Sequence, residues 1–158
     1  MLHEGEHIMT QKTDELDIKV IRELKKDART SYREIAEKLG VSEGTVYNRV
    51  QKLKEKGVIK RFIPDIDYSK LGYDLSALIG VTVEGGYLGE VEEVIAAEPN
   101  VSAVFDVTGE YDAVVVAKFR GREGLNDLVK RILSIPHVLR TNTMVVLNIV
   151  KEEHGVDV

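Results

Sequence analysis

The sequence has no cysteine, no tryptophan, only three prolines and no long apolar run. Without cysteine, the chain has no disulfide, no thiol nucleophile and no cysteine-ligated zinc. No apolar stretch nears the ~18 residues of a transmembrane helix, and residues 1–12 lack the apolar region of a secretory signal. We therefore expect a cytoplasmic protein without membrane contact, in which residues 1–12 are a flexible leader and Met9 is an alternative start.

Charge is unevenly distributed along the chain, whose net charge is −5. Residues 13–63 contain thirteen Lys and Arg against nine Asp and Glu, a net charge of +4, whereas residues 64–158 contain eight against sixteen, a net charge of −8. A basic segment joined to an acidic one is typical of a protein in which only one part faces phosphate. Ordinary solvated surfaces also produce such asymmetry, so this pattern alone is a weak indication.

Three short helical patterns with start and stop signals lie in residues 13–57. The second begins with the capping box of Ser31 and Glu34 and ends at Gly40, and the third begins at Ser42 and ends at Gly57. Two capped helices joined by so short a turn must cross steeply. The spacing predicts a helix-turn-helix whose apolar faces are Leu16, Val20, Ile21 and Leu24, then Ile35, Ala36 and Leu39, then Val46, Val50 and Leu53.

Polar side chains occupy the side of the third helix opposite its apolar stripe. Asn and Arg can pair bidentately with adenine and guanine edges in the major groove, which favours a DNA-reading surface over the outer face of a plain three-helix bundle. Glu43 could accept from cytosine or only support the helix N-terminus. The predicted DNA-contacting residues of the second and third helices are Ser31, Tyr32, Ser42, Glu43, Gly44, Thr45, Tyr47, Asn48, Arg49 and Lys52.

A strand is expected over residues 58–63, directly after the third helix. Because it carries the adjacent basic residues Lys60 and Arg61, it is interpreted as a wing whose side chains bind phosphate and add affinity without sequence information. Each of the two is about as well explained as an ordinary surface charge.

The second half repeats a strand–helix–strand pattern, with two prolines closing the helices. Right-handed crossovers place both helices on one face of a four-stranded antiparallel sheet. The predicted strands and helices are 75–83, 87–97, 101–108, 111–119, 122–134 and 138 to about 150. The fold class is therefore α+β, a winged helix-turn-helix plus a ferredoxin-like βαββαβ domain. The expected organisation is a leader at 1–12, a DNA-binding domain at 13–63, a linker at 64–73, a dimerisation and effector domain at 74–152, and a tail at 153–158.

The sheet face without helices is expected to be apolar. An open face in contact with water should be polar, so this face predicts a twofold homodimer, able to present two recognition helices to a pseudo-palindromic operator in double-stranded DNA. An alternation one residue out of register would reverse the two faces. The inward set is predicted as Ala77, Ile79, Val81, Ala103, Phe105 and Val115, and the dimer face as Leu78, Val104, Val114, Val116, Met144 and Val146.

Residues 108–112 predict a tight hairpin turn that ends at Asp112, whose carboxylate has no evident partner in the sequence. Asp112 lies on an apolar strand edge, where a charge needs a partner. The ammonium of a zwitterionic ligand could supply one, and a pair with a Lys or Arg is about as well supported.

The residues above resemble the Lrp/AsnC family of transcription regulators over residues 13–152. The resemblance rests on Leu16-Asp17, on residues 32–36 and 39–42, on Thr45-Val46 and Arg49-Val50, on 57–59, on Gly109-Glu110-Tyr111-Asp112 and on 143–146. It implies dimers that assemble into larger oligomers, and an amino acid or similar metabolite bound between C-terminal domains. The effector candidates that it implies are Gly109, Tyr111, Asp112, Thr143, Met144 and Val145.

Two other functions compete with DNA-dependent regulation. Siroheme decarboxylases resemble the same family, but the four histidines have neither metal-ligand nor acid–base spacing, and no phosphate loop or nucleophile motif is present. We therefore expect no enzyme activity, catalytic residue, metal or cofactor. An architectural DNA-binding protein of low specificity is disfavoured because such proteins are usually strongly basic.

Overall fold

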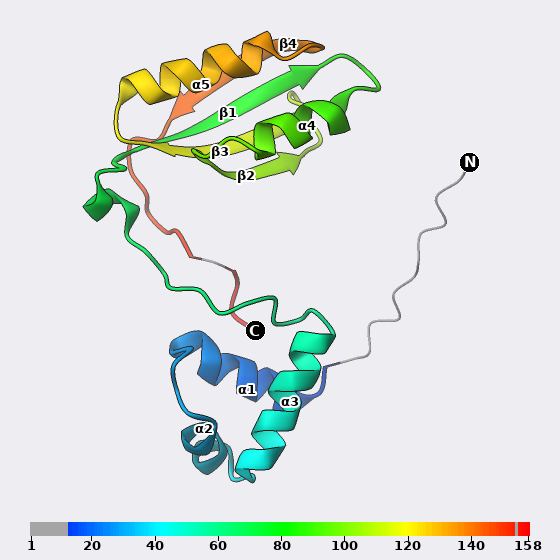
Figure 1. Cartoon of the computed structure of the whole chain (residues 1–158), viewed down its shortest axis with the longest axis vertical. Coiled ribbons are helices and arrows are strands. Elements are labelled where there is room, and N and C mark those ends of the chain that lie inside the picture. Colours follow the sequence, from blue (N-terminus) through cyan, green and yellow to red (C-terminus); the bar gives the residue numbers. More distant parts are fainter. Residues whose placement is uncertain (1–12, 154) are drawn as a thin grey trace. The chain divides into compact units, whose positions relative to one another are not determined.

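The computed structural model describes residues 13–153 and 155–158. Residues 13–64, with residues 155–158, form one compact unit, and Asp65–Glu153 forms the second. Among the described residues, the first unit contains three helices, and the second contains a sheet with two helices and a short 3-10 turn (Figure 1). None of the helices in the described residues has the length and apolar character needed to cross a bilayer.

Three helices make up the N-terminal unit: α1 (Glu15–Lys26), α2 (Tyr32–Leu39) and α3 (Glu43–Glu55). Each begins at a polar cap, because the first amides of a helix lack partners within it. Their apolar faces meet in one core, as the sequence predicts, although Leu16, Ile21 and Leu39 are only partly buried. The fully enclosed members are Val20, Leu24, Ile35, Ala36, Val46 and Val50.

The prediction of a strand directly after α3 is wrong. Residues 58–64, all of them described, form no β-structure, because a strand needs a partner ladder and none lies beside this segment in its unit. Only its beginning is attached: the Ile59 amide donates to the Leu53 carbonyl at 3.1 Å, and the Ile59 side chain packs on the helical core. Lys60 and Arg61 consequently lie on an exposed, extended segment.

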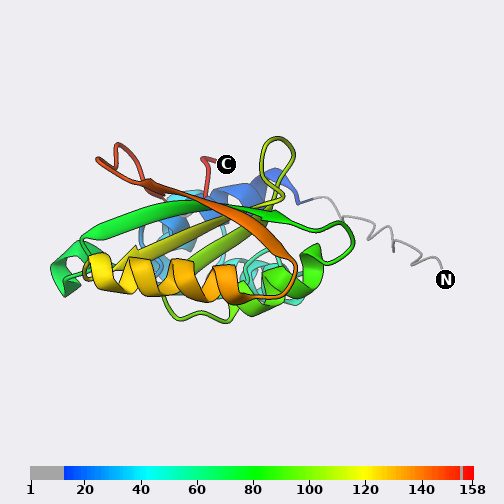
Figure 2. The same ribbon diagram turned by 90° about the horizontal axis from the view of Figure 1, so that it is seen from above.

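The C-terminal unit is a four-stranded antiparallel sheet in the order β2-β3-β1-β4. Its elements are β1 (Leu75–Val83), α4 (Leu88–Ala96), β2 (Val101–Asp106), β3 (Ala113–Phe119), α5 (Arg122–Ser134) and β4 (Val138–Val145). Both helices cover the same side of the sheet, as Figures 1 and 2 show. The predicted ferredoxin-like arrangement is confirmed, including the bounds of β1 and α5. The last strand ends at Val145, not near residue 150, and the predicted linker contains a 3-10 turn at Tyr68–Leu71.

The main core lies between the sheet and the two helices. Its largest buried side chains are Ile79, Ile95, Phe119, Leu128 and Ile132. On β1 and β3 the predicted alternation holds, since Ala77, Ile79, Val81 and Val115 are all fully buried.

The predicted alternation of β2 is wrong by one residue. The register shifts between Val101 and Ala103, so that Val104 pairs with Val115 and packs on the core, while Phe105 pairs with Val114. Phe105 is therefore on the open face, 54% exposed. An irregularity of this kind moves every later side chain to the other face. Val104 thus leaves the predicted dimer face, and Ala103 and Phe105 leave the predicted inward set.

Candidate nucleic-acid interface and ligand loop

The starts of α2 and α3 are each fixed by a serine cap, and α2 ends at a glycine. The Ser31 hydroxyl accepts from the Glu34 amide at 3.2 Å, and the Ser42 hydroxyl accepts from the Thr45 amide at 3.1 Å. Gly40 has φ 67°, a left-handed conformation that glycine adopts without steric cost. Two predicted DNA contacts, Ser31 and Ser42, thus shape the helix-turn-helix, although each remains exposed.

The outward side of α3 presents most of the predicted reading residues. Glu43, Gly44, Asn48 and Lys52 are exposed, and Thr45 is half-buried, its hydroxyl 2.8 Å from that of Ser42. A hollow of about 350 Å³ beside α3 is lined by Asp14, Asp17, Thr45, Asn48, Arg49, Lys52, Leu53 and Lys56. The structure therefore gathers Thr45, Asn48 and Lys52 on one side of the recognition helix.

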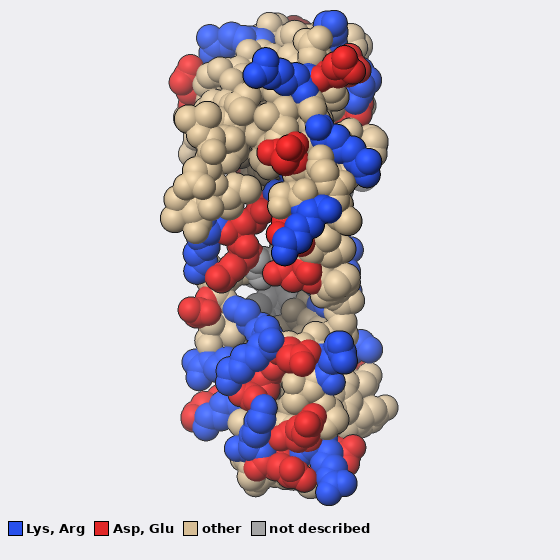
Figure 3. All heavy atoms as spheres, turned by 90° about the vertical axis from the view of Figure 1, so that its left-hand side faces the viewer, with Lys and Arg blue, Asp and Glu red and all other residues tan. Residues whose placement is uncertain are grey.

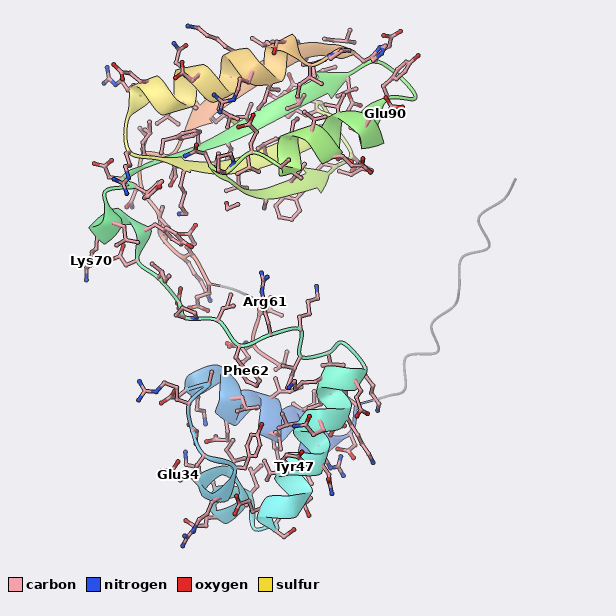
Figure 4. The ribbon with its side chains drawn as sticks, in the orientation of Figure 1. Glu34, Tyr47, Arg61, Phe62, Lys70 and Glu90 are labelled. Atoms are coloured by element: carbon pink, nitrogen blue, oxygen red, sulfur yellow. The ribbon has the colours of Figure 1, made fainter. Side chains whose placement is uncertain are left out.

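Two aromatic residues connect α3 with the start of α2. The rings of Tyr32 and Tyr47 pack edge to face with centroids 6.2 Å apart. Tyr47, which Figure 4 labels, is still 51% exposed. Edge-to-face packing restricts both rings. Tyr47 is therefore held in place at the surface beside Asn48.

Arg49 lies differently from the other predicted readers. Its Nη1 donates to Asp14 Oδ2 and, at 2.9 Å, to Asp17 Oδ1, and its side chain is largely covered. Hydrogen bonding from Arg49 lowers the pKa of Asp14, and Asp14 and Asp17 together raise the pKa of Arg49. Arg49 is thus engaged inside the unit.

Charges of both signs alternate over the N-terminal unit. Figure 3 shows Lys and Arg interspersed with Asp and Glu on one side of the molecule. Several are paired, as are Lys38 with Glu23 at 2.9 Å and Arg33 with Glu37 at 3.1 Å. Lys60 and Arg61 are exposed on the segment after α3, where Figure 4 labels Arg61. On the side that Figure 3 shows, cations and anions are mixed and do not form one large basic field.

The loop between β2 and β3 is held to β1 by Asp112. The Val83 amide donates to Asp112 Oδ2 at 2.8 Å, and the Asp112 amide donates to the Val81 carbonyl at 3.0 Å. Within the described residues of this chain, the partner of the Asp112 carboxylate is a backbone amide and not a Lys or Arg. Gly109, in the same loop, has φ 124°.

Tyr111 folds back from this loop onto the open face of the sheet. A Cβ on Gly80 would lie 2.6 Å from Tyr111 Cγ, so the ring rests directly on the Gly80 backbone. Asn142 of β4 donates through Nδ2 to the Tyr111 hydroxyl. The structure thereby joins the predicted ligand loop to the last strand. Sequence reasoning missed Gly80 and Asn142, and a glycine inside an apolar strand was the available signal for a close approach.

The three effector candidates on β4 do not share one face. Thr143 pairs with Ile79 and Val145 with Ala77, on the side that the helices cover, whereas Met144 pairs with Leu78 on the open side. Of the effector set, Tyr111 and Met144 therefore lie on the open face.

That open face carries apolar side chains on all four strands, and the register places Ser76, Thr82, Lys118, Arg140 and Asn142 on the same side. Leu78, Val114 and Val116 are half-buried, and Met144 is 39% exposed. Val146, just past β4, continues the register by donating its amide to the Ser76 carbonyl at 2.9 Å. Phe105, and not Val104, therefore shares this side of the sheet with the other residues of the predicted dimer face. Within residues 13–153 and 155–158, no three His, Asp or Glu side chains gather in a group that could hold a metal ion.

Comparison with known proteins matches both units. Residues 13–60 match the winged helix-turn-helix DNA-binding model, and residues 76–156 match the Lrp/AsnC ligand binding domain. An HTH-type transcriptional regulator of Pyrococcus horikoshii is 53% identical over 89% of this chain and 95% of its own length. The chain belongs to the Lrp/AsnC family. It is a transcriptional regulator with a helix-turn-helix DNA-binding domain and a ligand-binding domain.

Other members of the Lrp/AsnC family agree with this assignment. The HTH-type transcriptional regulator FL11 of P. horikoshii is 42% identical over 88% of this chain and 92% of its own length. The structure of Escherichia coli AsnC superposes with a TM-score of 0.85 at 28% identity, covering 90% of this chain and 97% of that one. The similarity thus extends over both units.

Proposed function

We propose that this Lrp/AsnC protein is a sequence-specific regulator that binds a pseudo-palindromic operator as a homodimer, and that an amino acid or similar metabolite modulates it. The observation that carries the first part is the exposed polar side of α3, where Asn48 and Lys52 stand beside the restrained ring of Tyr47. Asn can pair bidentately with adenine, and Lys52 can bind phosphate. Such a regulator acts on the chromosome, so we propose a cytoplasmic location and no enzymatic role.

Dimerisation by the open face would supply the second recognition helix. The face exposes Phe105 and Met144, together with half-buried valines. An apolar surface of this kind is costly in water and is typical of a subunit interface. Twofold symmetry of the protein then predicts an inverted repeat in the DNA.

The test begins with duplexes selected from a random pool by the intact protein. We expect an inverted repeat, and we expect Asn48→Ala to lose about 1–3 kcal/mol of binding to it. Lys54→Ala, which removes an exposed charge from the same helix, is the matched control and should weaken all duplexes alike. Selection of no common sequence would refute the proposed specificity.

The ligand proposal rests on Asp112 and the loop that it holds. Asp112→Asn retains an oxygen that accepts from the Val83 amide but removes the charge that would meet an ammonium group. We expect titration calorimetry with the twenty amino acids to detect binding that Asp112→Asn abolishes, while DNA binding is unchanged. Glu110→Gln removes a charge from the same exposed loop and should keep the response. A response that survives Asp112→Asn would make Asp112 purely structural.

A further inference from the structure

Arg49 of α3 joins the recognition helix to the capping box of α1. In that box, the Asp17 amide donates to Asp14 Oδ1 at 2.8 Å, and the Asp14 amide donates to Asp17 Oδ2 at 3.2 Å. The remaining oxygens, Asp14 Oδ2 and Asp17 Oδ1, both accept from Arg49 Nη1. Each carboxylate therefore uses one oxygen to start its own helix and the other to hold α3.

Burial distinguishes the pair of Arg49 with Asp17 from a surface ion pair, since these side chains are 29% and 11% exposed, whereas Asp14 at the edge of the cluster is 53% exposed. Asp17 is 8% exposed and is the buried charged residue of the described chain. Exposed ion pairs contribute little because water and salt screen them. A covered carboxylate that has lost its water depends on its partner, and removal of that partner is costly.

The charge of the cluster argues against a DNA contact by Arg49. Two carboxylates and one guanidinium have a net charge of −1, so the cluster itself offers no positive charge to a phosphate, unlike Lys52 and Lys56 in the same hollow. To reach a base, Arg49 would have to leave Asp17 covered and unpaired. Asn48 and Lys52 line the same hollow and are exposed, without such a cost.

We infer that Arg49 is a positioning residue: with Asp14 and Asp17 it fixes the rotation of α3 against α1, and thereby decides which side chains of α3 face DNA. Val20 of α1 and Val46 of α3 belong to the same apolar core, and apolar burial is non-directional. The hydrogen bonds of Arg49 supply the direction. The inference rests on the proposed sequence specificity.

The two roles of Arg49 predict opposite effects of Asp14→Asn. Asparagine caps a helix as well as aspartate does, so α1 keeps its start while the ion pair loses a charge. If Arg49 positions α3, the ratio of specific to non-specific affinity falls. If Arg49 contacts DNA, Asp14→Asn releases it and removes a repelling charge, so the ratio stays or rises.

The experiment measures this ratio by fluorescence anisotropy on a selected duplex and on its scrambled version. Asp14→Asn, Asp17→Ala, Arg49→Ala and the double variant Asp17→Ala/Arg49→Ala are compared with wild type. Asp27→Asn is the control for net charge, because its carboxylate oxygen only accepts from the Arg29 amide, as an asparagine oxygen can. We expect a loss of about tenfold for Asp14→Asn and Arg49→Ala, and a double variant no worse than Arg49→Ala.

Salt dependence gives a readout that is independent of stability. Loss of a phosphate contact lowers the slope of log affinity against log salt by about 1, whereas a positioning role leaves the slope of Arg49→Ala unchanged. A reduced slope, or a ratio that Asp14→Asn leaves intact while Arg49→Ala lowers it, would overturn the inference.

The proposed specificity and the inference fail in different ways. Equal affinity of wild type for both duplexes would refute the specificity alone. The cluster is then tested by thermal melting, where Asp17→Ala and Arg49→Ala should lower the melting temperature by less together than the sum of their single effects. Additive losses would show that the three residues do not act as a unit.

Discussion

Replacement of Gly80 by alanine should disturb the sheet only because Tyr111 lies on it. An alanine Cβ would be 2.6 Å from Tyr111 Cγ and 2.7 Å from Cδ1 and Cδ2, distances at which the ring must move. The ring is held through its hydroxyl by Asn142. Overpacking of this kind costs about 1–3 kcal/mol. We expect Gly80→Ala to lower the free energy of opening of the sheet by that amount.

In a Tyr111→Ala background, the effect of Gly80→Ala on the stability of the sheet should change sign. Glycine inside a strand costs about 0.5–1 kcal/mol relative to alanine, so Gly80→Ala becomes stabilising once the ring is gone. The coupling between the two substitutions is then about 1.5–4 kcal/mol, the sum of both effects.

Peptide-resolved hydrogen exchange of β1 and β3 measures this, because it reports the opening of the sheet separately from the helical unit. All variants are compared at one protein concentration, since association stabilises the folded state. Gly85→Ala is the matched control: its Cβ would meet nothing within 4 Å. If Gly80→Ala costs no more than Gly85→Ala, or costs the same without Tyr111, then the ring does not rest on Gly80.

Three further outcomes are expected. Glu92 has a buried Oε1 without a partner in the described residues, and burial raises its pKa, with Asp106 adding to the effect. Glu92→Gln should therefore stabilise the protein in urea unfolding at neutral pH, and the difference should vanish once acid protonates Glu92 in the folded and unfolded states. Equal stability of the two proteins at neutral pH would contradict this. Glu98 accepts hydrogen bonds from Arg131 at 2.9 and 2.8 Å, which lower the pKa of Glu98. The stabilisation by this pair is present above the ordinary carboxyl pKa and is lost as the pH falls through the lowered pKa of the folded state. Glu98→Gln should therefore destabilise the protein at neutral pH but not in strong acid. Phe105→Asp should dissociate the dimer in sedimentation at a cost of about 2 kcal/mol or more, and an unchanged dimer would place the interface elsewhere.

Most of the helices and strands could be predicted from residue patterns within each element. Five apolar residues at helical spacing, from Leu125 to Leu133, and Pro136 beyond them, gave the bounds of α5. The alternation in residues 75–83 gave β1. Both signals are contained within one element, so the sequence alone was sufficient.

Features that depend on distant partners could not be predicted in this way. The shift after Val101 arises from how β2 pairs with β3, and it exchanged the faces of Val104 and Phe105. The strand expected after α3 is missing because no partner strand lies beside it. For the same reason, the candidate site was predicted from residue types, which do not show the contacts of its members: Arg49 has the chemistry of a base reader, and carboxylates 32 and 35 positions away bind it.

The most direct test of the account is the affinity of the intact protein for its selected duplex and for a scrambled duplex, measured by anisotropy at physiological salt. Sequence-specific recognition by α3 predicts a preference of about a thousandfold or more. Equal, weak binding to both duplexes, without and with each amino acid added, would contradict the claim that this chain reads a DNA sequence.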